Sequence, residues 1–518
     1  MNNRAKKYFD IYAPVFYPAA IIVLLFVVTT IVFQERAERY FGTFQAYMSD
    51  TFGWMINLCI NYYLVFILVL AFSRYGRLRI GGPKAQAEFS KFSWVAMLFS
   101  AGMGIGLVYF SVAEPMYHFL NPLRADWPAA LKAEYAMKHT FFHYGFHVWG
   151  IYCLLGIALA YCCFNRGLPL SLRSTLYPFL GERIHGWLGN TIDTIAVLAT
   201  LFGLATSLGF GAVQFSTGFS RLFGVANGLS LQVTSIIVIT LIATLSVLSG
   251  LGKGLKYLSN LNMVLALVLF LFVLAIGQTA SLLDGCIENL GIYLDDFLVV
   301  STFRGTYTEG GDWFRGWSMF YWAWWISWAP FVGTFIARIS KGRSIREIAL
   351  YGLLLPSLFC FIWMSVFGGI ALDLQLSGQL DVAAAVSADS STGLFVVLEQ
   401  LPLSRYSSLL CVLLVATFFI TSSDSGSLVV DFMTTGGKLD SPKGQKIFWA
   451  RVEVAIAIDL LLGGGLAALQ SASIVTGFPF ALVLVVVSLA LWKALRQDTR
   501  EAAQSEPSER VGEESLRS

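Results

Sequence analysis

Apolar stretches recur along the whole chain, separated by short segments rich in polar and charged residues. Most are about 20 residues long, which is the length at which an α-helix crosses the ~30 Å hydrocarbon core of a membrane. The pattern predicts an all-α polytopic membrane protein. We place twelve transmembrane helices at residues 13–33, 53–72, 92–112, 140–164, 191–217, 232–250, 258–278, 317–337, 348–372, 406–430, 447–467 and 472–493.

Basic residues are distributed unevenly between the loops that join these predicted spans. The N-terminus and every second loop hold more than twice as many lysines and arginines as the loops between them. Because basic residues are retained on the cytoplasmic side, both termini are expected in the cytoplasm. Residues 1–12 would form the N-terminal segment, and residues 494–518, rich in Glu, Ser and Arg, a short disordered tail.

Two predicted spans have unusual sequences. The third carries Gly102, Gly104 and Gly106, and each glycine weakens a helix by about 1 kcal/mol relative to alanine. The eighth contains Pro330, where we expect the helix to break. Discontinuous helices at corresponding positions of two halves are typical of transporters that bind substrate and ions near the bilayer midplane. The alternative is that the glycines only allow close helix packing.

The five-helix interval between these two spans divides the chain into parts. Residues 13–72 are predicted to form two peripheral helices, residues 92–278 the first repeat, and residues 317–493 a second repeat of opposite orientation. Between the repeats, residues 279–316 mix apolar and acidic side chains. This segment is predicted to be an amphipathic linker helix on the outer surface of the membrane.

The eighth span contains a dense aromatic cluster with the sequence FYWAWWISWAP. At ~100° per residue, four of its side chains fall on one face of the helix. These four residues are Tyr321, Trp324, Trp325 and Trp328. Electron-rich ring faces attract cations, and an aromatic cage suits a quaternary ammonium group, which has no N–H to donate.

The fourth span offers a second aromatic set, Tyr144, Trp149 and Tyr152, that could close such a cage. Interfacial anchoring and core packing are the alternatives for both sets. Anchoring explains Trp328 least well, because that residue is expected near the middle of the bilayer.

Several histidines and acids lie inside predicted spans, where charge is costly. His139, His143 and His147 recur at every fourth position and share one stripe of a helix. They could bind a metal or relay protons, but the stripe faces away from the aromatic set, and packed histidines are commoner. Asp424 is more simply explained as a structural acceptor for the neighbouring serines.

Several classes of protein lack support in the sequence. There is no H-E-x-x-H motif, no G-x-x-x-x-G-K-[ST] motif, and no carboxylate or thiol constellation in the predicted inner loops. This argues against an enzyme and against an ATP-driven pump. The net charge of +3 gives no reason to expect a nucleic-acid partner. Large aromatic side chains at mid-depth argue against an open channel.

Four segments carry a resemblance to a known family. They are FYWAWWISWAPFVGTFIARISKGRSIRE, SAGMGIGLVYFSVAEP, HVWGIY and TFFITSSDSGS, and together the chain resembles the betaine–choline–carnitine transporter family over all twelve predicted spans. The resemblance implies a LeuT-like five-plus-five inverted-repeat core, formed by spans 3–7 and 8–12, with two extra N-terminal helices. It also implies a homotrimer in the bacterial inner membrane that works by alternating access.

The resemblance assigns a substrate-binding set, in which Tyr144 stands where the family often has tryptophan. Its members are Met103, Gly104, Tyr144, Trp149, Tyr152, Trp324, Trp325 and Trp328. Tyrosine at this position keeps the cage aromatic but changes its width, and so the head group that the cage prefers. Proton-coupled, choline-type relatives tend to carry an aspartate where this chain has Gly106, and its absence favours a zwitterionic substrate.

The resemblance also assigns ligands for Na⁺ as the coupling ion, with no other cofactor. Hydroxyls beside unwound backbone can coordinate Na⁺, although hydroxyls in membrane helices more often bond to their own helix or a neighbour. The first site would comprise Ser100, Met103, Phe418, Thr421 and Ser422. The pattern for a second site, with Thr200 and Ser207, is incomplete because Leu204 offers no oxygen where the family has threonine.

These expectations combine into a secondary active transporter that imports a betaine-like methylated onium zwitterion by sodium symport. Glycine betaine and dimethylsulfoniopropionate both present methyl groups around a positive centre and suit an aromatic cage. The alternative is a proton-coupled or exchange-type transporter of choline or carnitine. An osmosensor without transport also fits the sequence.

Overall fold

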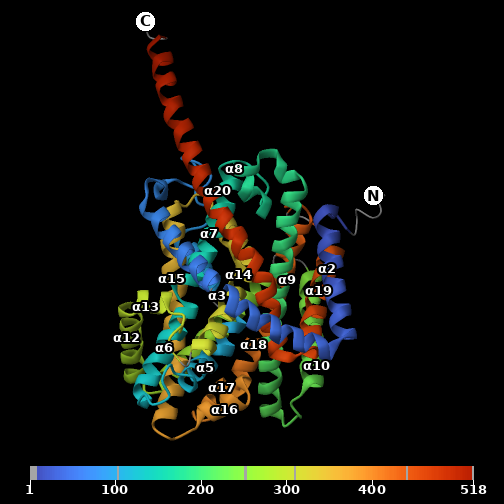
Figure 1. The fold of residues 1–518 in the computed structure, drawn as a ribbon, viewed down its shortest axis with the longest axis vertical. Helices are drawn as coiled ribbons and strands as arrows, with labels where there is room; N and C mark the ends of the chain where they lie inside the picture. The colour runs from blue at the N-terminus through green and yellow to red at the C-terminus, as the bar shows by residue number, and fades with distance from the viewer. Residues whose placement is uncertain (1–8, 102–103, 250–253, 309–310, 439–440, 516–518) are drawn as a thin grey trace.

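The computed structural model describes residues 9–101, 104–249, 254–308, 311–438 and 441–515. These residues form helices joined by short connections, with no β-strand among them (Figure 1). Most of the predicted N-terminal segment 1–12 lies outside the described residues, as do Gly102 and Met103.

The α-helices are, in chain order, α2 (Ala13–Val32), α3 (Gln34–Phe72), α4 (Lys91–Ala101), α5 (Ile105–Leu120), α6 (Ala129–Tyr144), α7 (Phe146–Phe164), α8 (Tyr177–Leu180), α9 (Trp187–Phe223), α10 (Leu229–Ser249), α11 (Gly254–Ile276), α12 (Thr279–Asp295), α13 (Phe297–Thr302), α14 (Gly311–Ile339), α15 (Ile345–Leu376), α16 (Val382–Ala388), α17 (Gly393–Leu398), α18 (Ser404–Thr434), α19 (Lys443–Leu462) and α20 (Gly465–Ser515). Short 3₁₀ turns are η1 (Arg74–Arg77), η2 (Leu172–Leu176), η3 (Gly181–His185) and η4 (Ser390–Thr392).

Eight helical stretches in the described part of the chain are long and apolar enough to cross a membrane, so the protein is a polytopic membrane protein. They are Ala13–Val32, Gln34–Phe72, Ala129–Phe164, Trp187–Phe223, Tyr257–Ile276, Ile345–Leu376, Ser404–Thr434 and Gly465–Glu501. The twelve predicted ranges each overlap one of the helices above or a consecutive pair, and the last two both reach into α20.

The glycine-rich third span is interrupted, as its sequence predicted. Helix α4 ends at Ala101, α5 begins at Ile105, and Gly104 before it has extended backbone with φ −169° and ψ 178°. The interruption leaves the first N–H groups of α5 without helical partners. The N-cap residue, Gly104, has no side chain that could accept from them.

The predicted break at Pro330 is wrong, because α14 continues through this residue to Ile339. Pro330 has no N–H to donate to the preceding turn. The helix is held on several sides by packing against α3, α7, α9 and α20, and the Thr334 hydroxyl donates to the Pro330 carbonyl at 2.6 Å. Such surroundings allow proline inside a membrane helix.

A break that the sequence did not predict separates α6 from α7 at Gly145. A Cβ at this position would lie 2.6 Å from the Phe141 carbonyl oxygen and 2.7 Å from the Phe361 ring. Only glycine therefore fits between α6 and α15. The bend places the end of α6 and the start of α7 beside α14.

Residues 494–515, most of the segment predicted as a disordered C-terminal tail, are helical. They continue α20, which projects beyond the other helices (Figure 1). The segment is rich in Ala, Glu, Gln and Arg, which favour helix. At its base, Asp498 accepts hydrogen bonds from the Tyr161 hydroxyl and from the Arg166 guanidinium, each with a shortest distance of 2.6 Å.

Candidate functional site

Six aromatic side chains from three helices surround one small pocket. They are Tyr144 of α6, Trp149 and Tyr152 of α7, and Trp324, Trp325 and Trp328 of α14. Gly104, Gly106, Ser207 and Cys360 are among the other lining residues, and the enclosed space is about 60 Å³. We call this space the aromatic pocket. The structure thus brings together seven of the eight predicted substrate residues, and the eighth, Met103, lies outside the described part of the chain.

Hydrogen bonds to backbone hold two of the tryptophans in the aromatic pocket. The Trp325 indole N–H donates to the His143 carbonyl at 2.9 Å, just before the α6–α7 break. The Trp328 indole N–H lies 3.0 Å from the Gly203 carbonyl and 3.1 Å from the Ser207 hydroxyl. These hydrogen bonds satisfy the polar edges of two rings that border the aromatic pocket.

The rings also pack on one another. Trp324 and Trp325 stack with centroids 4.8 Å apart and an interplanar angle of 13°. Tyr144 meets Trp325 edge-on at 5.5 Å, and Trp149 meets Tyr152 edge-on at 5.4 Å. These stacked and edge-on arrangements are the favourable ones for aromatic pairs.

The indole N–H groups of Trp149 and Trp324 are buried and have no hydrogen-bond partner among the described residues. A buried donor without a partner costs free energy. Both residues line the aromatic pocket.

No charged side chain is found among the residues described as lining the aromatic pocket. A bound cation would therefore rely on ring faces for attraction. An anionic group would find the N-terminus of α5, because Ile105, Gly106 and Leu107 line the pocket. The free N–H groups and the helix dipole at such a terminus favour negative charge.

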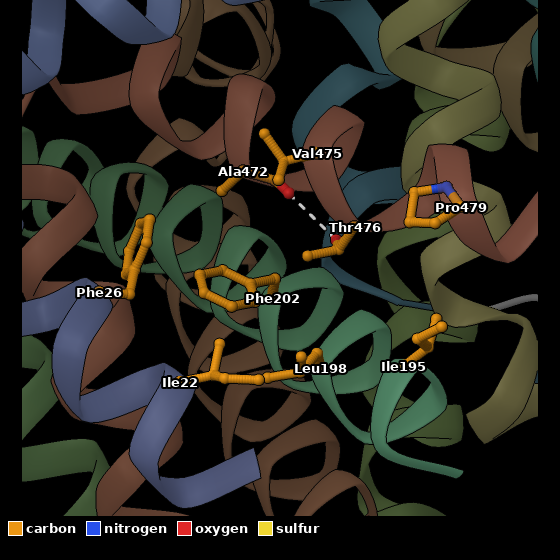
Figure 2. A pocket seen from close by; sticks show the side chains of 9 residues that line it. All are labelled: Ile22, Phe26, Ile195, Leu198, Phe202, Ala472, Val475, Thr476 and Pro479. Atoms are coloured by element: carbon orange, nitrogen blue, oxygen red, sulfur yellow. Dashed lines mark hydrogen bonds between the residues drawn. The ribbon is translucent and has the colours of Figure 1, made fainter. Parts of the chain in front are cut away.

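A larger cavity of about 200 Å³ lies elsewhere, between α2, α9 and α20 (Figure 2). It is lined by Ile22, Phe26, Ile195, Leu198, Phe202, Ala472, Val475, Thr476 and Pro479. The hydroxyl of Thr476 is already bonded to the Ala472 carbonyl at 3.0 Å. Such a lining cannot orient a polar ligand, so we take the smaller aromatic pocket as the candidate site.

The predicted first sodium site is described only in part, because Met103 lies outside the described residues. Ser100 is in the last turn of α4, and Phe418, Thr421 and Ser422 are on α18. The Thr421 hydroxyl lies 3.0 Å from the Thr417 carbonyl and accepts from the Asn262 amide at 2.8 Å. Asn262 of α11 is a polar neighbour that sequence reasoning missed.

The two residues predicted for a second sodium site bond within their own helix. The Thr200 hydroxyl donates to the Ala196 carbonyl at 2.8 Å, and the Ser207 hydroxyl to the Gly203 carbonyl at 3.2 Å. Ser207 also lines the aromatic pocket. Leu204, at the position without an oxygen, packs against Gly426 of α18.

The three histidines of α6 and α7 are buried. One of them, His143, contacts the carboxylate of Glu114, a residue that the sequence analysis did not single out. His143 Nδ1 lies 2.7 Å from Glu114 Oε1, and His143 Nε2 lies 2.9 Å from the Ser318 hydroxyl. His147 Nε2 lies 3.3 Å from the Asn61 side chain. A lone acid in the apolar segment SVAEPMYH was the available signal for Glu114.

Known transporters are similar to this chain over most of its length. The family model for betaine/carnitine/choline family transporters matches residues 14–500. A glycine betaine/proline/choline transporter of Vibrio parahaemolyticus is 43% identical over 508 residues, covering 95% of this chain and 91% of the relative.

Two further relatives are glycine betaine transporters. The one from Bacillus subtilis is 43% identical over 467 residues, covering 89% of this chain and 90% of its own length. The one from Acinetobacter baylyi is 41% identical over 499 residues, covering 96% of this chain and 75% of its own length. Because the family model matches nearly the whole chain, the chain belongs to the betaine/carnitine/choline transporter family and is a membrane transporter, not an enzyme.

Proposed function

We propose that this protein is a secondary active transporter that imports a betaine-like methylated onium zwitterion, such as glycine betaine or dimethylsulfoniopropionate. The observation that carries the proposal is the uncharged pocket bounded by six aromatic side chains. The three relatives above, whose names all include glycine betaine, support the same class of substrate.

In this proposal the two ends of the substrate meet different parts of the aromatic pocket. The onium group lies against the faces of Trp149, Tyr152 and Trp325, each of which would contribute about 0.5–2 kcal/mol of attraction. The carboxylate faces the N-terminus of α5 and the free indole N–H groups of Trp149 and Trp324. A zwitterion matches this arrangement better than a simple cation, because the pocket offers no carboxylate of its own.

Sodium symport is the proposed driving force. Ser100, Met103, Phe418, Thr421 and Ser422 would hold the first ion, and Thr200 with Ser207 would contribute to a second only if the backbone replaced the oxygen missing at Leu204. Support for the first site is the α4–α5 interruption, because interrupted helices can supply backbone carbonyls as ligands for Na⁺.

We further propose the LeuT-like core of two inverted five-helix repeats within twelve spans, with α2 and α3 as the peripheral helices. The homotrimer, alternating access, cytoplasmic termini and bacterial inner membrane complete the proposal. The interrupted pair α4 and α5 supports it, since transporters of this architecture bind substrate at such interruptions.

The second candidate is proton-coupled or exchange-type transport of choline or carnitine. The word choline in the name of the Vibrio parahaemolyticus relative favours it. Choline carries a net positive charge, however, and would use the aromatic faces without using the N-terminus of α5.

Uptake by the purified full chain in proteoliposomes tests the proposal. Radiolabelled glycine betaine should accumulate under an inward Na⁺ gradient, and excess unlabelled dimethylsulfoniopropionate should compete. Accumulation of choline but not glycine betaine, driven by a pH gradient in Na⁺-free buffer, would establish the second candidate instead.

A further inference from the structure

Glu114 of α5 is fully buried, and its carboxylate accepts hydrogen bonds from side chains on three helices. One oxygen lies 3.0 Å from His118 Nε2 and 2.7 Å from His143 Nδ1. The other accepts from the Trp317 indole N–H at 3.1 Å and from the Tyr321 hydroxyl. Each oxygen therefore has two partners, which is as many as a carboxylate oxygen readily accepts.

The ligand atoms of Glu114, His118 and His143 lie within 4.8 Å of one another, so a metal ion is an alternative explanation for the cluster. Two further donors, Trp317 and Tyr321, also point at the carboxylate. A tryptophan N–H cannot ligate a metal, and it needs an acceptor. The complete set of partners therefore indicates a carboxylate that holds neighbouring side chains in place through hydrogen bonds.

The cluster is connected to the aromatic pocket in two ways. Tyr321 packs against Trp325, with ring centroids 5.9 Å apart, and its hydroxyl lies 3.3 Å from that of Tyr144. The second connection is His143, whose ring bonds to Glu114 while its carbonyl accepts from the Trp325 indole. Both connections end on side chains that line the pocket.

We propose that Glu114 is a positioning residue for the aromatic pocket and sets its affinity for substrate by holding Tyr321 and His143 in place. The inference rests on the proposed function above. Trp317 and Tyr321 lie one turn apart on α14, so the carboxylate fixes the helix that carries Trp324, Trp325 and Trp328. Hydrogen bonds to a charged acceptor are stronger than those to a neutral one, which suits this role.

Substitution by glutamine separates the charge of Glu114 from its hydrogen bonds. A glutamine carbonyl can still accept from Trp317 and Tyr321, while its NH₂ group can donate to histidine nitrogens, because either ring nitrogen of a neutral histidine can be an acceptor. Glu114→Gln thus weakens these hydrogen bonds, whereas Glu114→Ala removes them and leaves buried donors without partners.

The test is the Kd of glycine betaine, measured by calorimetry on the purified full chain with Na⁺. We expect Glu114→Gln and Tyr321→Phe each to raise Kd about threefold to tenfold, and Glu114→Ala to raise it more. If Glu114 acts through Tyr321, the double variant Glu114→Gln/Tyr321→Phe should bind no more weakly than the weaker single variant. If the two substitutions instead raise Kd by factors that multiply, Glu114 does not act through Tyr321, which would overturn this part of the proposal.

Asp193→Asn is the matched control, because Asp193 is another fully buried acid and pairs with Arg173 at 2.5 Å in a different part of the protein. It should lower the melting temperature without changing Kd. The near-ultraviolet circular dichroism of the aromatic residues should change in Glu114→Gln without ligand and should change less in the control. Variants of Glu114 that lose stability but keep the wild-type Kd and spectrum would overturn the proposal. A wild-type protein that binds no methylated onium compound would instead overturn the proposed function.

Discussion

Gly106 lies against the outer edge of the Trp324 indole ring, so closely that a Cβ at position 106 would be 2.6 Å from the Trp324 Cη2 atom. The contact joins the first turn of α5 to the aromatic face of α14. It gives this glycine a steric role, since its backbone lies within a helix and needs no unusual φ. Any side chain at position 106 must displace the ring that stacks on Trp325.

Gly106→Ala should therefore impair binding. We expect the affinity for glycine betaine to fall about tenfold and the unfolding free energy to fall by about 1–3 kcal/mol, the usual cost of overpacking. Calorimetric binding and thermal unfolding of the purified protein would measure both. Gly316→Ala, on the same helix as Trp324 with nothing within 4 Å of its Cβ, is the matched control. Equal effects of the two substitutions would contradict the steric explanation.

Trp325→Leu should keep the aromatic pocket apolar while removing one cation-attracting ring. Because such a ring contributes about 0.5–2 kcal/mol, we expect the half-saturation concentration for glycine betaine to rise about 2- to 30-fold while the amount of protein in the membrane holds. Trp187→Leu is the control, since Trp187 is 74% exposed at the start of α9, away from the pocket. Uptake that is unchanged in Trp325→Leu would rule out the aromatic cage.

Much of this arrangement was predictable from the sequence because it depends on local signals. Apolar length located the helices, and the helical spacing of Trp324, Trp325 and Trp328 predicted a shared aromatic face. The glycines before Ile105 predicted the α4–α5 interruption. Each of these signals lies within about 20 consecutive residues, which is the range over which helix periodicity and propensity act.

The remaining features depend on contacts between distant segments. The need for glycine at position 145 comes partly from Phe361, more than two hundred residues later, and the continuity of α14 through Pro330 depends on the helices packed around it. The role of Glu114 emerges only when α5, α6 and α14 meet, since its donors come from all three. No periodicity in the sequence encodes such a meeting.

Thr421→Ala should reveal whether the proposed sodium site operates. Loss of a hydroxyl ligand is expected to raise the Na⁺ concentration for half-maximal uptake about tenfold, since a hydrogen-bonding or coordinating group of this kind contributes about 1–2 kcal/mol. Thr417→Ala is a close control one turn earlier on α18, because that hydroxyl bonds to the Leu413 carbonyl of its own helix at 2.9 Å. The measurement is the initial rate of uptake into proteoliposomes at a series of Na⁺ concentrations. Identical Na⁺ dependence in the wild type and Thr421→Ala would count against this ligand.

Gly145→Ala tests the bend between α6 and α7. The added methyl group would meet the Phe141 carbonyl oxygen and the Phe361 ring at under 3 Å, so the two helices must separate or rotate. Because Tyr144 precedes the bend and Trp149 follows it, either movement changes the width of the aromatic pocket. We expect a loss of about 1–3 kcal/mol in unfolding free energy, together with weaker binding of glycine betaine. The double variant Gly145→Ala/Phe361→Leu, which makes room for the methyl group, should recover part of both losses. If the second substitution brings no recovery, the contact with Phe361 is not what requires glycine at this bend.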